Sequence, residues 1–157
     1  MPSAISLAKF VGTISLGLLT GVSYTLSTQS LPSLLTLPSA KPAAHTLNHT
    51  TRLATLHIRT LSTLSSASFL LAFALSPSHI RHPYLLWTAL VAGAGGALNL
   101  LMEKDAKSPV IKHEIGEVNG EQVEKRARDQ QRLEFIRTAI SGLGLTMSVI
   151  GIWGDGA

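Results

Sequence analysis

Cysteine is absent from this 157-residue chain, so disulfide bonds and thiolate metal ligands are excluded. Charge is scarce too, because Asp, Glu, Lys and Arg make up 14% of the residues, against roughly a quarter in soluble domains. Residues 1–102 contain no acid at all, and eight of the nine acids fall between Glu103 and Glu134. A soluble fold carries mixed charge over its whole surface. The composition therefore argues against a water-exposed globular enzyme.

The net charge of +4 and the pI near 9.8 do not indicate a nucleic-acid partner. Basic residues are sparse everywhere except between the third and fourth apolar runs, where acids neutralise them. A membrane-related charge bias explains this excess better than a nucleic-acid groove does. We therefore expect no nucleic-acid binding.

Long apolar runs are the dominant feature of the chain. Four of them approach the roughly 20 residues that a helix needs to cross hydrocarbon. We expect an uncleaved first run, because it is longer than the apolar part of a usual signal peptide. The sequence predicts an all-α, four-helix transmembrane bundle that forms a single membrane domain over residues 1–157, with the lipid bilayer as its main partner. The predicted spans are residues 10–28, 57–75, 83–102 and 135–153.

Residues 103–134 differ from the runs on either side and form a hydrophilic, partly helical loop. From Glu121 onward the pattern predicts a charged helix that continues into the fourth span. Glu124 and Arg128 lie four residues apart, a spacing that supports a solvated helix. We expect the charges of this loop to face water.

Ser108 carries the only hydroxyl of that loop, and Pro109 follows it. A phosphate there would add negative charge beside Lys104, Lys107 and Lys112. Ser108 is therefore a candidate phosphorylation site, with an unmodified Ser-Pro turn as the alternative.

Small residues recur at four-residue spacing inside the spans. Such faces allow helix backbones to approach closely in lipid. We expect them to serve helix packing within the bundle, and a homo-oligomer remains the alternative. The packing candidates are Gly17 with Gly21, Ala92 with Gly96, and Gly144 with Ser148. The serines of the second span are expected to bond back to their own helix.

Ionisable residues are nearly absent from the predicted spans. Arg137 stands near the start of the fourth span, and we expect no acid near the bilayer centre. Proton relays and general acid–base pairs need such groups. We expect no catalytic residue, no cofactor and no metal site.

Basic residues are distributed unequally between the two sides of the predicted bundle. Lys9 and Arg81 are the two that lie on the side of the termini, and the other eleven lie on the side of the two longer connections. The positive-inside rule places these connections in the cytosol and both termini on the opposite side.

Three short motifs resemble one known family when they are taken together. Residues 81–87 read RHPYLLW, residues 150–156 read IGIWGDG, and the first span contains KFVG and then GLLTG. In this order they resemble the fungal autophagy-related protein 33 family. The resemblance implies a small multi-pass protein of the mitochondrial outer membrane that promotes mitophagy. In that membrane the positive-inside rule would place both termini in the intermembrane space. It implies an adaptor or quality-control role, autophagy machinery or other membrane proteins as partners, and no catalytic residues.

Two other functions remain open from the sequence. Residues 31–35, LPSLL, and the first span before them resemble the small four-span membrane oxygenases of the anthrone-oxygenase type. A structural subunit of a larger membrane complex is the other alternative.

Overall fold

The computed structural model describes residues 2–77, 81–106 and 120–154, and every regular element in these ranges is helical. The first helix runs without a break through three segments, α1 (Pro2–Thr25), the π-helix η1 (Leu26–Ser30) and α2 (Leu31–Leu34). Three further helices follow, which are α3 (Ala40–Leu75), α4 (Tyr84–Ala106) and α5 (Gly120–Gly154). The predicted four-helix bundle is confirmed.

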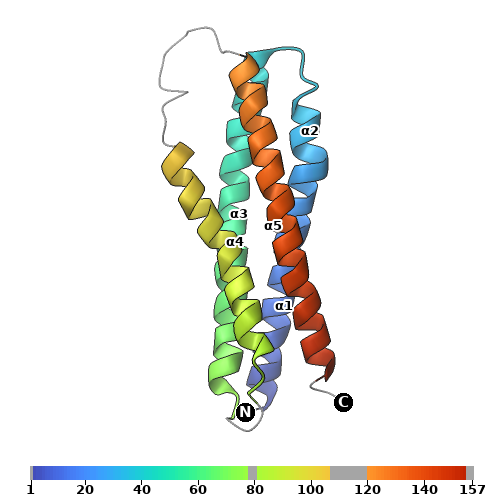
Figure 1. The fold of residues 1–157 in the computed structure, drawn as a ribbon, viewed down its shortest axis with the longest axis vertical. Helices are drawn as coiled ribbons and strands as arrows, with labels where there is room; N and C mark the ends of the chain where they lie inside the picture. The colour runs from blue at the N-terminus through green and yellow to red at the C-terminus, as the bar shows by residue number, and fades with distance from the viewer. Residues whose placement is uncertain (1, 78–80, 107–119, 155–157) are drawn as a thin grey trace.

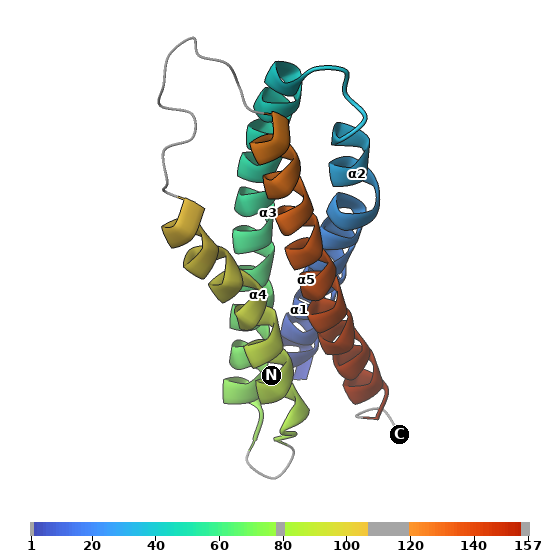
Figure 2. The same cartoon turned by 45° about the horizontal axis from the view of Figure 1, so that its top comes forward.

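The helices alternate in direction along the chain. In Figure 1, α1 rises from the lower end, α3 descends, α4 rises and α5 descends, so the first and last described residues lie at the same end. The upper part of α4 leans away from the other three helices, as Figure 2 also shows. The bundle therefore has four helices below and three above.

Two separate clusters of buried side chains follow this division. The lower cluster joins α1, α3 and α4 through residues such as Leu16, Phe69 and Leu85. The upper cluster joins α2, α3 and α5, and we call this upper three-helix part the head. The buried apolar residues of the head are Leu31, Leu34, Ala43, Leu47, Val123 and Ala127.

The helices extend beyond the predicted spans. α3 has 36 residues, which is about 54 Å of helix and far more than the ~30 Å of a bilayer's hydrocarbon. Pro32, which lies beyond the predicted first span, falls inside this continuous helix just after the π-helix, where its missing N–H removes one backbone hydrogen bond. α3 begins at Ala40, well before the predicted second span at residues 57–75.

Large apolar side chains cover the outside of the lower bundle. Contiguous exposed apolar surface of this extent is rare on soluble monomers. Three helical stretches of the described chain, Ala4–Leu34, Ala40–Leu75 and Gly120–Gly154, are long and apolar enough to cross a membrane. The apolar part of α4, Tyr84–Leu98, is shorter. The exposed residues include Phe10, Ile14, Leu18, Leu70, Leu71, Trp87, Leu90, Leu143, Val149, Ile150 and Trp153. These helices suggest a membrane protein.

Candidate functional site

Serine hydroxyls on α3 hold the neighbouring helices. Ser62 donates a hydrogen bond to the Ala92 carbonyl and accepts one from the Gly96 N–H at 3.0 Å. In an α-helix the carbonyl of residue 92 and the N–H of residue 96 bond to each other, so the Ser62 hydroxyl contacts both partners of one backbone bond of α4. Ser65 donates to the Gly12 carbonyl of α1 at 2.9 Å. The expectation that these serines bond back to their own helix is wrong for both. Their carbonyl partners are accessible because both neighbouring helices carry glycine at the contact.

Glycines and alanines set how closely the helices approach. Ala92 is fully buried, and a Cβ placed at Gly96 would lie 2.7 Å from the Ser62 hydroxyl. A Cβ at Gly144 would lie 2.7 Å from Cγ1 of Val91 on α4. These three small residues therefore lie at contacts between helices.

The other predicted packing residues are placed differently. Ser148 is fully buried and donates its hydroxyl to the Leu145 carbonyl of its own helix. A Cβ at Gly17 would meet Leu145 at 3.7 Å, an ordinary contact. A Cβ at Gly21 would meet nothing within 4 Å, so this glycine faces open space. The role of the six residues in helix packing stays a prediction.

A buried ion pair occupies the boundary between the head and the lower bundle. Arg137 and Glu134, three residues apart on α5, form a salt bridge, and their side chains are 1% and 0% exposed. Three-residue spacing places both on one helix face. The prediction that the charges up to Glu134 face water is wrong for this residue, because that face of α5 points into the bundle. Arg137, expected near an edge, is buried as well.

The surroundings of the pair are polar on the head side. Gln130 donates an amide N–H to Oε1 of Glu134 at 2.9 Å, while Oε2 of Glu134 has no hydrogen-bond partner within the described residues. Gln131, the next residue of α5, donates an amide N–H to the Ser27 carbonyl of η1 at 2.9 Å. A π-helix shifts its backbone bonds by one residue and so needs an outside donor for a carbonyl. Gln131 supplies that donor.

Below the pair the surroundings are apolar and tightly packed. A Cβ at Gly95 of α4 would lie 3.6 Å from Leu19 and 4.0 Å from Cγ of Arg137. About 25 Å of helix separates Arg137 from Gly154 at the lower end of α5. This depth is comparable with the ~30 Å thickness of bilayer hydrocarbon. The pair thus lies near the upper edge of such a layer, and the burial of both side chains makes a single unpaired charge costly there.

A buried ion pair of this kind favours a structural role over a catalytic one. Two buried charges repay their desolvation only while they remain together, and both partners stand on α5, so the pair balances its own charge within this helix. A carboxylate salt-bridged to arginine is also a poor general base. We therefore interpret the pair as the charge-balanced part of the face of α5 that is buried in the bundle.

The exposed charges of the head behave as the sequence predicts. Arg128 donates two hydrogen bonds to Oε1 of Glu124, and both side chains are more than half exposed. Ser108 lies outside the described residues. No group of three His, Asp or Glu side chains that could hold a metal ion occurs in the part of the chain that the structure describes.

Sequence reasoning missed the burial of Glu134 and the bonds of Ser62 and Ser65 between helices. One signal for the pair was present in the residue spacing. Glu134, Arg137, Ser141, Gly144 and Ser148 follow each other at three- or four-residue steps, which places them on a single face of α5. Because the small residues of this face pack inside the bundle, the same face predicts that the Glu134 carboxylate lies inside the bundle as well.

The fold and the buried pair define a class, which is a small helical bundle with an apolar exterior and a polar three-helix head. Comparison with known proteins identifies the family within that class. The profile of the autophagy-related protein 33 family matches residues 1–134. The chain is also 40% identical, over 185 aligned positions, to the autophagy-related protein 33 of Gibberella zeae, and the alignment covers 99% of this chain and 93% of that protein. The chain belongs to the autophagy-related protein 33 family, as its motifs indicate. No solved structure matches it.

Proposed function

We propose that this chain is a non-enzymatic, multi-pass protein of the mitochondrial outer membrane that promotes the selective autophagy of mitochondria. The observation that carries the proposal is family membership, because the relative is similar over nearly the whole chain and is named for autophagy. The apolar exterior of the lower bundle supports insertion in a membrane. The family name favours a role without catalysis.

The orientation follows from charge. The head carries Lys41, Arg52 and the mixed charges of upper α5, whereas Lys9 and Arg81 are the basic residues toward the other end. The positive-inside rule puts the head in the cytosol and both termini in the intermembrane space. In this orientation the head is the part that meets the autophagy machinery, as an adaptor or quality-control factor.

Deletion of the gene tests this function. We expect a fluorescent reporter targeted to the mitochondrial matrix to reach the vacuole much less in starved or stationary cells of the deletion strain. Delivery of a cytosolic bulk-autophagy reporter should be unchanged, and re-expression of the full chain should restore mitochondrial delivery. Equal delivery of the matrix reporter in deletion and parent strains would refute the proposed function.

A further inference from the structure

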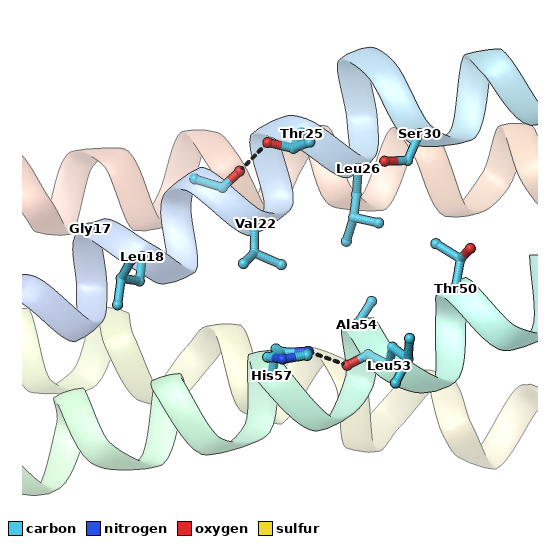
Figure 3. Close-up of a pocket in the computed structure, with 11 residues that line it drawn as sticks. Gly17, Leu18, Val22, Thr25, Leu26, Ser30, Thr50, Leu53, Ala54 and His57 are labelled. Carbon is cyan, nitrogen blue, oxygen red and sulfur yellow. Dashed lines mark hydrogen bonds between the residues drawn. The ribbon is translucent and has the colours of Figure 1, made fainter.

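An open groove lies on the outside of the bundle between α1–η1 and upper α3 (Figure 3). Its volume is about 520 Å³, within the range of roughly 300–1,000 Å³ typical of sites for one small molecule. The groove extends from Gly17 to Ser30, about 20 Å of helix. This length is comparable with one leaflet of hydrocarbon, about 15 Å. Its lining residues are Gly17, Leu18, Gly21, Val22, Thr25, Leu26, Ser30, Thr50, Leu53, Ala54 and His57.

The hollow exists because α1 has glycine where a side chain would fill it. A Cβ at Gly21 meets nothing within 4 Å, and Gly21 is exposed. Leu18, Val22, Leu26 and Leu53 supply apolar walls on both sides. The groove therefore offers a dry surface to a flat apolar body.

The polar groups of the groove are all neutral hydroxyls or imidazole. Ser30 and Thr50 lie together at the head end of the groove in Figure 3. His57 lies beside Leu53, and its Nδ1 donates to the Leu53 carbonyl at 2.8 Å, because a carbonyl oxygen only accepts. That bond leaves Nε2 for a second partner, and in the tautomer that donates from Nδ1 this nitrogen accepts from a hydroxyl.

No Lys, Arg, Asp or Glu is among the lining residues. A phospholipid phosphate calls for cations or several backbone donors, and this groove provides neither. A molecule with a rigid apolar body and one hydroxyl matches what is present.

From this groove we infer a binding site for a sterol of the surrounding bilayer. The ring system lies against Gly17 and Gly21, and the hydroxyl bonds to Nε2 of His57. The site rests on the membrane placement in the proposed function but not on the role in mitophagy. Because α1 and α3 both line the groove, a bound molecule would contact both helices and stabilise the junction between the head and the lower bundle.

Photolabelling tests the site directly. The full chain is reconstituted in phosphatidylcholine vesicles that contain a diazirine sterol with a free hydroxyl, irradiated, and mapped by mass spectrometry. We expect the label on α1 and α3 peptides that line the groove. Excess unlabelled sterol should compete, while excess anionic phospholipid should not.

Two variants separate this site from general lipid contact. Gly21→Leu adds a side chain to the hollow, where its Cβ meets nothing within 4 Å, and should reduce groove labelling to that of a surface without a sterol site. Ala94→Leu, at an exposed position of α4, is the matched control and should label like the natural chain. His57→Phe keeps the bulk and removes the bond, so labelling should fall about fivefold, the equivalent of one hydrogen bond of about 1 kcal/mol. A sterol whose hydroxyl is methylated should show a smaller difference between His57→Phe and the natural chain.

Three results would overturn the site. These are equal labelling of Gly21→Leu and the natural chain, competition by anionic phospholipid in place of sterol, and cross-links between two copies through a cysteine at position 21 that sterol does not reduce. Insertion is measured separately by resistance to alkaline carbonate. A chain that inserts but shows no groove label refutes the sterol site and leaves the proposed function standing.

Discussion

Replacing Arg137 with methionine is expected to destabilise the bundle by about 3–5 kcal/mol, the cost of leaving one partner of a buried ion pair uncompensated. Glu134 would then remain 0% exposed beside Gln130 alone, without its counter-charge. Methionine retains most of the volume of the arginine stem, so the loss reports charge more than packing. Thermal unfolding of the purified chain in detergent measures the effect.

The control for this prediction is the exposed ion pair of Arg128 and Glu124 on α5. Arg128→Ala breaks the exposed bridge to Glu124 and should cost less than about 1 kcal/mol. The double variant Glu134→Leu/Arg137→Met removes both buried charges and should recover most of the stability lost by Arg137→Met, because the remaining carboxylate is gone. A single Arg137→Met that melts like Arg128→Ala would show that the buried Glu134 does not need its counter-charge.

Adding one methyl group at Gly144 or at Gly142 is expected to have opposite effects. In Gly144→Ala the new Cβ would lie 2.7 Å from Cγ1 of Val91 and 3.3 Å from Cδ2 of Leu16, so the Val91 side chain or the helix that carries it must shift. Overpacking of this kind costs roughly 1–3 kcal/mol. In Gly142→Ala the nearest atom is Cγ2 of Thr20 at 3.8 Å, an ordinary contact. This change should stabilise the helix by up to about 1 kcal/mol, the difference in propensity between alanine and glycine.

The two alanine variants control each other, because they differ by only two positions on one helix. Unfolding of both proteins in the same detergent measures the sign of each effect. If both substitutions stabilise the chain, α5 does not pack against α4 as closely as the structure places it.

Much of the architecture follows from the sequence because apolar runs of about 20 residues specify helices almost regardless of detail. The four helices and the continuous α5 are predicted correctly on this basis. The ends of the helices are not, because Pro32 and the polar start of α3 look like loop residues unless their packing in the head is known.

The buried polar contacts were harder to predict, since they depend on which face of a helix meets which neighbour. Ser62 pairs with Gly96 across 34 positions of sequence, and no local pattern encodes that contact. Glu134 stands in sequence at the end of the charged loop, but it lies on the face of α5 that is buried in the bundle. The groove between α1 and α3 likewise exists only when Gly21 and His57 are brought to the same surface.

The central claim is that lipid surrounds the lower bundle while the head stands in water. Its most direct test uses the absence of cysteine from the chain. Single cysteines are introduced at exposed positions, Leu71 and Leu143 below and His49 and Gln122 in the head. Isolated mitochondria are then treated with a membrane-impermeant maleimide, which reacts with thiolate in water. We expect rapid labelling at positions 49 and 122, and labelling at 71 and 143 only after the membrane is dissolved. Equal labelling at all four positions in intact membranes would contradict the account.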